Sequence, residues 1–242
     1  MGCGQSPTKD EKNTKQFHEL SEEEKEKRKK QMEEQDKDLK EEVNENEDPS
    51  VYEKYDWDKL IQKLPTEKTA QERKKRLALW NQLNEYGNGY LSYKRLSVQL
   101  DKYLELPNAV KSKGPIKLAF KSSCNKFAKK GLKVEDNLIE WMEFRIFLVY
   151  LRQYFEYWEM FQRIDSSGDL KITLDEFRKA IPKMKEWGVE IKENEAEKEF
   201  NNIKVDNEDT ISFEEFCNFA IQKSLDLEDD DNFDDEELKH LK

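Results

Sequence analysis

One twelve-residue stretch decides the fold: Asp165-Ser166-Ser167-Gly168-Asp169-Leu170-Lys171-Ile172-Thr173-Leu174-Asp175-Glu176. Apolar residues at helical spacing precede it and follow it, as in two amphipathic helices joined by a loop. They are Tyr157, Met160, Phe161 and Ile164 before the loop, and Phe177, Ala180, Ile181 and Met184 after it. Oxygen-bearing groups recur at positions 1, 3, 5, 7, 9 and 12 of the stretch, which is the ligand spacing of an EF-hand.

This loop is the expected metal site, because calcium takes six to eight hard oxygens and a carboxylate at position 12 can supply two of them. The expected ligands are Asp165, Ser167, Asp169, the carbonyl of Lys171, Thr173 and Glu176. Position 6, which usually is Gly because the turn needs a positive φ, is Leu170. An EF-hand that stays empty is therefore the alternative for this loop.

A second frame with the same spacing runs from Lys204 to Glu215. The weaker metal site predicted there would use Asp206, Glu208, Thr210, Ser212 and Glu215. Lys204 holds position 1, where an ammonium group offers only donors and repels a cation.

Two earlier frames keep the pattern of the loop and lose its ligands. The loop from Asn84 to Arg95 has Tyr86 at position 3 and Arg95 at position 12, and the loop that ends at Glu143 has Leu132 and Val134 at positions 1 and 3. Neither is expected to bind calcium. Four frames that can pair two by two predict an all-α fold of two EF-hand pairs.

The 242 residues carry a net charge of −11 that is unevenly distributed. Residues 1–50 have a net charge of −6 and predict a charged arm; residues 51–150, at +8, hold the degenerate first pair. Residues 151–225, at −6, hold the candidate calcium pair, and residues 226–242, at −7, predict a disordered acidic tail. Within the arm, Ser21 and Glu24 form a capping-box pattern. Because the helix that follows has few apolar residues and no heptad seam, we expect it to be solvated rather than a coiled coil.

The chain opens Met1-Gly2-Cys3-Gly4-Gln5-Ser6, which fits the N-myristoylation pattern. Gly2 is the predicted myristoylation site, and Cys3 is placed for palmitoylation. One acyl chain holds a protein to a membrane only marginally, whereas two make the attachment stable.

Several classes of function are not expected. The two histidines, His18 and His240, lie in the charged ends, which disfavours histidine-dependent catalysis, and no phosphate-binding loop is present. The three cysteines are widely spaced, so a disulfide framework is not expected. We expect the protein to lie in a reducing compartment. The chain is not expected to be an enzyme, and it has no nucleic-acid-binding motif.

The run from Leu138 to Tyr150, the segment from Asp175 to Val189, the stretch from Trp57 to Pro65 and the Met-Gly-Cys start together resemble the calflagins. These are acylated flagellar calcium-binding proteins of trypanosomatid protists. The resemblance implies four EF-hands, attachment to the flagellar membrane through Gly2 and Cys3, and calcium in the third and fourth hands. Lys204 departs from that pattern and puts the fourth site in doubt.

Two functions follow. The leading one is a calcium sensor or adaptor, acylated and held at the cytoplasmic face of a ciliary or flagellar membrane; the alternative is a calcium-indifferent scaffold of the axoneme or ciliary membrane. The expected partners are an anionic membrane surface and a protein target that the sequence does not identify; nucleic acid is not expected, and the oligomeric state is not predicted. Basic residues that could face the membrane are Lys74, Lys75, Arg76, Lys111, Lys113, Lys117, Lys121, Lys126, Lys129 and Lys130.

Overall fold

The structure is a computed structural model that describes residues 21–37, 39, 56–106, 114–129, 138–206 and 208–223. The predictions for Gly2, Cys3 and the acidic tail fall outside these residues. So do those for Leu132, Val134, Lys111, Lys113 and Lys130.

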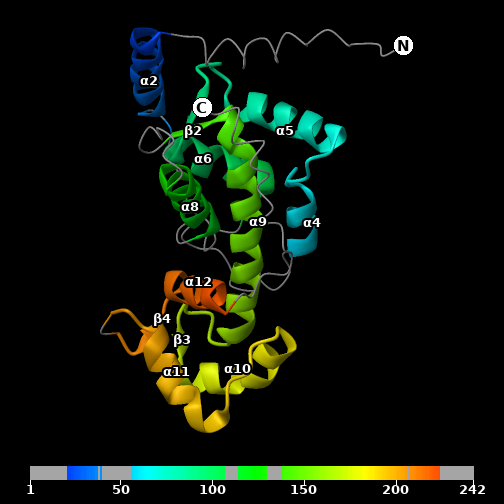
Figure 1. Ribbon diagram of the computed structural model, residues 1–242, viewed down its shortest axis with the longest axis vertical. Helices are drawn as coiled ribbons and strands as arrows, with labels where there is room; N and C mark the ends of the chain where they lie inside the picture. Colours follow the sequence, from blue (N-terminus) through cyan, green and yellow to red (C-terminus); the bar gives the residue numbers. More distant parts are fainter. Residues whose placement is uncertain are drawn as a thin grey trace.

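The described residues are mostly helical, which confirms the all-α prediction (Figure 1). The helices of the N-terminal half are α2 (Glu22–Asp36), α4 (Trp57–Gln62), α5 (Ala70–Leu83), α6 (Tyr93–Leu104) and α8 (Pro115–Lys129). Helix α9 (Trp141–Ile164) is followed by α10 (Leu174–Glu186), the 3-10 turn η1 (Glu193–Glu195), α11 (Ala196–Ile203) and α12 (Phe213–Gln222). The short strands are β1 (Tyr90–Ser92), β2 (Leu138–Glu140), β3 (Ile172–Thr173) and β4 (Thr210–Ile211).

Each pair of hands is joined through its loops by one two-stranded antiparallel sheet. Strand β1 pairs with β2, with Leu91 opposite Ile139, and β3 pairs with β4, with Ile172 opposite Ile211. All four residues hold position 8 of their frames, and all four are fully buried. The four hands predicted from the sequence therefore pair first with second and third with fourth.

Helix α9 runs from the N-terminal half into the C-terminal half and belongs to both pairs (Figure 1). It leaves the second loop and enters the third one, and it spans 24 residues. Helices α4, α5 and α8 pack on it in the N-terminal half, and α10 and α12 pack on it in the C-terminal half. The division predicted between residues 150 and 151 falls inside this helix.

The core is continuous from one pair to the other and is rich in aromatic rings. The ring centroids of Trp80 and Phe144 lie 5.2 Å apart in the N-terminal half. Those of Trp158 and Phe213 lie 4.8 Å apart in the C-terminal half. The phenylalanines of the third and fourth hands are buried core residues: Phe161, Phe177, Phe200, Phe216 and Phe219. None of the described helices is long and apolar enough to cross a bilayer.

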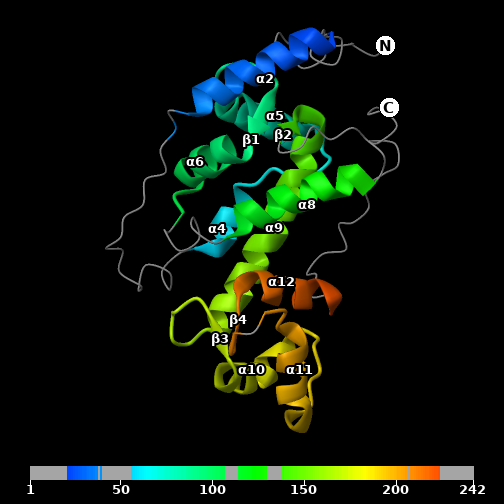
Figure 2. The same cartoon turned by 90° about the vertical axis from the view of Figure 1, so that its left-hand side faces the viewer.

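The expectation of a solvated arm helix fails along one edge of α2, whereas most of its residues are exposed. Helix α2 has the predicted capping box at Ser21 and Glu24, but Met32 and Asp36 on one of its edges are buried. Met32 packs with Tyr90 and Leu138, so α2 lies against the end of the molecule that carries β1 and β2 (Figure 2).

Arg76 is also wrongly predicted as a surface cation. Its guanidinium is buried and donates to the carbonyl oxygens of Pro65 and Glu67, at 2.8 and 3.1 Å. These two carbonyls lie in the turn between α4 and α5, so Arg76 serves to hold that turn against the core.

Candidate metal site

The third loop is held between the last turn of α9 and the first turn of α10. Asp165 follows directly on α9, where its backbone N–H donates to the carbonyl of Phe161 at 2.9 Å. Thr173 caps α10, and its hydroxyl accepts from the N–H of Glu176. Positions 1, 9 and 12 are therefore fixed by the ends of two helices rather than by the loop alone.

The carboxylate of Asp165, at position 1, faces the inside of the loop. Its Oδ1 accepts from the Ser167 hydroxyl at 3.0 Å and from the Gly168 N–H at 2.8 Å, and its Oδ2 accepts from the Leu170 N–H at 2.8 Å. Burial raises the pKa of Asp165 despite these hydrogen bonds, and the charge of Asp169 adds to the rise. A positive charge in the loop would offset that cost.

Glu176, at position 12, reaches back over the loop from the first turn of α10. Its Oε1 accepts from the Ser167 N–H at 3.0 Å and from the Ser166 hydroxyl at 3.1 Å. Its Oε2 accepts from the N–H and the hydroxyl of Thr173 at 2.9 and 2.8 Å. Burial alone would raise the pKa of Glu176, but the hydrogen bonds from Thr173, Ser167 and Ser166 together lower it, so the carboxylate is ionised.

The backbone of the loop adopts the turn despite Leu170. Gly168 has a φ of 73° and Leu170, at position 6, has a φ of 63°. The left-handed conformation costs a residue with a side chain about 1–2 kcal/mol relative to Gly. Leu170 at position 6 therefore strains the backbone of the loop but does not prevent the loop from forming.

The remaining predicted ligands are placed differently. Asp169 accepts from the backbone N–H of Lys171 at 3.0 Å, and the side chain of Lys171 donates to Glu208 of the fourth loop at 2.6 Å. The structure thus brings Asp165 together with Ser167, and Glu176 with Ser167 and Thr173. Across the described ranges, no three Asp, Glu, His or Cys side chains are gathered as a metal-holding group. The donor set consists of hard oxygens, which is the chemistry that calcium prefers over softer metals.

The fourth loop has the same frame, and lysine ammonium groups lie near two of its carboxylates. Glu215 accepts from the Val205 N–H at 2.7 Å and from the Ser212 hydroxyl at 2.7 Å. The ammonium of Lys204 lies 3.9 Å from Asp209 and 5.4 Å from the centre of the Phe200 ring. With the Lys171 ammonium on Glu208, two lysines lie on carboxylates of this loop. Sequence reasoning found Lys204 and missed the side chain of Lys171, since only the pairing of the loops brings it there.

In the first loop, the residue at position 12 is a buried cation instead of a carboxylate. The side chain of Arg95 is 1% exposed, and it forms an ion pair with Asp36 of α2 at 2.7 Å. A guanidinium at this position offers no oxygen ligand to calcium. In the second loop, burial raises the pKa of Glu143 from 4.5 to about 7.

Two family models cover these loops in pairs. The FCaBP EF-hand domain matches residues 60–151, and the EF-hand domain pair matches residues 158–221. Flagellar calcium-binding protein TB-1.7G of Trypanosoma brucei brucei is 34% identical over 191 residues, which cover 75% of this chain and 78% of that protein. The chain belongs to the flagellar calcium-binding protein family.

Other flagellar calcium-binding proteins match to a similar extent. TB-24 of Trypanosoma brucei brucei is 34% identical over 179 residues, or 70% of this chain and 77% of the relative. The Trypanosoma cruzi protein is 28% identical over 175 residues, or 72% of this chain and 82% of the relative. The resemblance to calflagins read from the sequence is confirmed. Helix α2 lies outside both family models, so the arm is a part of this family member that the EF-hand models do not describe.

Proposed function

We propose that this member of the flagellar calcium-binding protein family binds calcium through its third EF-hand and acts as an acylated sensor or adaptor at a flagellar or ciliary membrane. One observation carries the calcium proposal. Ser167 links the two carboxylates of the loop, because its hydroxyl donates to Asp165 and its N–H donates to Glu176, both at 3.0 Å. Positions 1, 3 and 12 thus converge from the two helices on one small volume.

The response to calcium would be transmitted through Glu176. Bound calcium would supply a dipositive charge for oxygens whose present partners are N–H and hydroxyl groups. Glu176 lies in the first turn of α10. The ring centroid of the next residue, Phe177, lies 5.7 Å from that of Phe200 and 6.3 Å from that of Phe219. A shift of the Glu176 carboxylate therefore moves a ring in the centre of the C-terminal core, which is how sensor hands change the angle of the following helix.

A calorimetric titration with calcium tests this proposal. The full chain should bind in the range of sensor hands, with a dissociation constant of about 10⁻⁷–10⁻⁵ M. Glu176→Gln should lose this binding, because it removes the charge at position 12 and keeps the size of the side chain. Glu215→Gln makes the same change in the fourth loop and should bind nearly as the wild type does. Equal binding by Glu176→Gln and the wild type would refute the assignment.

For membrane attachment, we propose that the acyl chains on Gly2 and Cys3 carry the anchoring and that surface lysines add to it. Of the lysines expected to face the membrane, those that the structure describes as exposed are divided between α5 (Lys74, Lys75) and α8 (Lys117, Lys121), which lie on opposite sides of α9 (Figure 1). At most one of these groups faces a flat membrane at a time. Each cation near an anionic surface contributes about 1 kcal/mol, which is too little for anchoring by two lysines alone. Gly2→Ala should therefore release the protein from flagellar membranes, and retention of this variant would contradict the proposal.

The alternative, a calcium-indifferent scaffold, is favoured by one observation. The first and fourth loops carry cations of the chain itself, Arg95 and Lys204, at positions that belong to calcium ligands in a working hand. Detergent extraction of isolated flagella separates the two functions. A protein held by acyl chains should leave with the membrane, whereas a scaffold should stay with the axoneme.

A further inference from the structure

The hydroxyl at position 9 donates to a carboxylate in the first, third and fourth loops, and the source of that carboxylate differs. In the third loop, Thr173 donates to Glu176 at 2.8 Å; in the fourth, Ser212 donates to Glu215 at 2.7 Å. Both acceptors come from position 12 of the same loop. In the first loop, Ser92 donates to Asp36, which comes from the arm helix α2. Asp36 therefore takes the place of the missing position-12 carboxylate.

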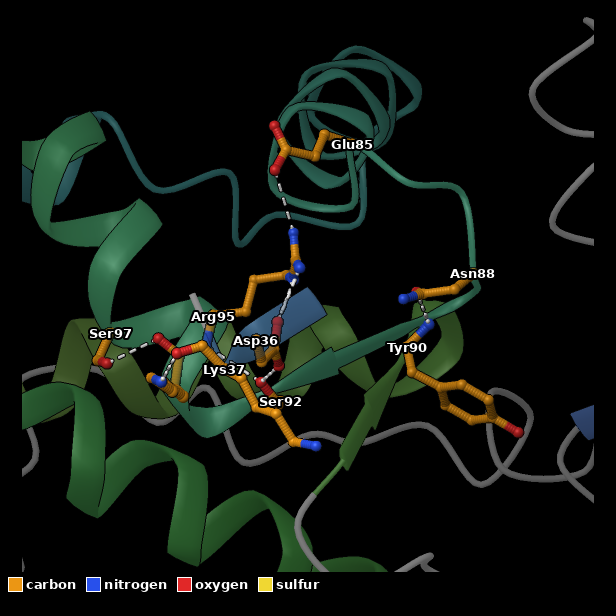
Figure 3. A network of polar contacts seen from close by, with 9 residues as sticks. Asp36, Lys37, Glu85, Asn88, Tyr90, Ser92, Arg95 and Ser97 are labelled. Atoms are coloured by element: carbon orange, nitrogen blue, oxygen red, sulfur yellow. Dashed lines mark hydrogen bonds and ion pairs between the residues drawn. The ribbon is translucent and has the colours of Figure 1, made fainter. Parts of the chain in front are cut away.

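The same carboxylate neutralises the buried cation of the first loop (Figure 3). Oδ1 of Asp36 accepts from Nε and Nη2 of Arg95 at 3.0 and 2.7 Å. The side chains of Arg95 and Asp36 are only 1% and 8% exposed. Without α2, the acidic partner left to Arg95 among those described is Glu85, at 3.3 Å, whose side chain is 48% exposed. If the charge of Asp36 is removed while α2 stays docked, the guanidinium of Arg95 remains buried without its main counter-charge, which is costly.

Other contacts fix the position of the helix on this site. Met32 lies one turn before Asp36, hence on the same face of α2, and is 1% exposed in a cluster with Tyr90 and Leu138. The ammonium of Lys94, next to Arg95, donates to the carbonyl of Lys37 at 3.4 Å. Beyond these contacts α2 is a highly charged helix of 15 residues, a length that is marginal for an isolated helix in water.

We propose that the loop face of the first EF-hand is a binding site for an acidic helix, that α2 of the same chain occupies it, and that this docking does not depend on calcium. The site contacts a methionine and an aspartate that lie four residues apart on the bound helix. The guanidinium of Arg95 supplies permanently the positive charge that a calcium ion supplies in a working loop. Because no group of this site is a predicted ligand of the third loop, the inference stands independently of the proposed function.

Hydrogen exchange of the α2 amides in the full chain tests the docking. Asp36→Asn keeps the shape of the side chain and removes its charge. Asp36 ends α2, where a negative charge opposes the helix dipole, so Asp36→Asn should favour the isolated helix slightly. Faster exchange would therefore report undocking. We expect at least about tenfold faster exchange, since breaking a buried ion pair is strongly destabilising.

Glu34→Gln is the matched control, because it removes the same charge from the same last turn at an exposed position. It should exchange within about twofold of the wild type. Met32→Ala tests the site through its apolar contact and should also accelerate exchange. Near-ultraviolet circular dichroism, to which Trp80 and Trp141 contribute together with the other tryptophans, would verify that the chain stays folded. Wild-type exchange rates in both Asp36→Asn and Met32→Ala would overturn the proposal.

The same measurement with calcium and with a chelator tests the second half of the proposal. The protection of α2 should be equal in the two conditions. Loss of protection on adding calcium would overturn it, because the arm would then be released by the metal. Failure of calcium binding in the third loop would leave this result unchanged and would appear separately in the calorimetric comparison of the wild type with Glu176→Gln.

Discussion

The two EF-hand pairs have the same loop frame and treat position 12 in opposite ways. In the C-terminal pair, Glu176 and Glu215 are carboxylates with lowered pKa values: burial alone would raise them, but hydrogen bonds from loop N–H and hydroxyl groups outweigh it. In the N-terminal pair, position 12 is the buried cation Arg95 in one loop and Glu143, with a raised pKa, in the other. Both pairs keep the two-stranded sheet between their loops, although their residues at position 12 differ in charge. The fold therefore depends on position 8, and the charge that fills the loop is free to vary.

The contrast between Glu143 and Glu176 shows what sets the charge state. Glu176 accepts four hydrogen bonds from its loop. Glu143 is 9% exposed and accepts from the N–H of Glu140 at 3.0 Å, which does not outweigh the effect of its burial. The same residue at the same position is thus an ionised ligand candidate in one pair and a buried group with a pKa near 7 in the other.

The largest effect expected from this contrast is a pH dependence of the N-terminal pair. The pKa of Glu143 is raised from 4.5 to about 7, so within this window the folded protein keeps a proton that the unfolded chain has lost. The free energy of unfolding should fall by on the order of 2–3 kcal/mol as the pH rises through the window, and level off above it. Urea unfolding at several pH values, followed by tryptophan fluorescence, measures this.

Glu143→Gln is the control for the pH effect. The amide does not titrate, so this variant should have a flatter profile over the same window. A profile as steep as that of the wild type would assign the pH dependence to other groups.

An intermediate effect is expected when the residue at position 6 of the third loop is replaced by the glycine that the first loop has there. The first loop has Gly89 there, with a φ of 88°, and the third loop has Leu170, with a φ of 63°. Leu170→Gly removes about 1–2 kcal/mol of backbone strain and also the contact of the half-buried Leu170 side chain with the core, so the net gain should be below about 1 kcal/mol. Urea or thermal unfolding measures this change.

Gly168→Ala is the matched opposite change in the same loop. Gly168 has a φ of 73°, and a Cβ there would meet no atom within 4 Å, so only backbone strain would count. It should destabilise by about 1 kcal/mol. Leu170→Gly would contradict the strain argument if it destabilised the chain as much as Gly168→Ala does.

The smallest effect concerns a direct ion pair between the two halves. The ammonium of Lys121 on α8 lies 3.0 Å from Glu214 on α12, with both side chains more than half exposed. Exposed pairs contribute little, so Lys121→Ala should cost less than about 1 kcal/mol in urea unfolding. A loss above about 2 kcal/mol would mean that this surface contact, rather than the shared core, joins the two pairs.

Most of the fold could be predicted from the sequence, because the signals are local. Ile172 and Ile211 at position 8, the capping pairs Thr173–Glu176 and Ser212–Glu215, and the apolar spacing of α9 each lie within one helical or loop repeat. The ligand residues could be named for the same reason. Whether they bind metal together stays a prediction.

The contacts of charged side chains could not be predicted in the same way. Asp36 and Arg95 are 59 residues apart, and nothing in their neighbourhoods marks one as the partner of the other. Helix α2 has Met32 as its buried apolar residue, a pattern too weak to separate a docked helix from a solvated one. Arg76 is buried because two turn carbonyls need a donor, and a one-dimensional charge count treats it like any surface cation.

Helix α9 has a mechanical consequence for the whole protein. Its 24 residues are shared by both pairs without an intervening linker, so the rotational phase of one pair relative to the other is set by the count of residues in a single helix. One inserted residue in its middle would turn the C-terminal pair by about 100° and move it by about 1.5 Å along the axis. The third loop is therefore held in a fixed orientation relative to the face of the molecule that carries α2.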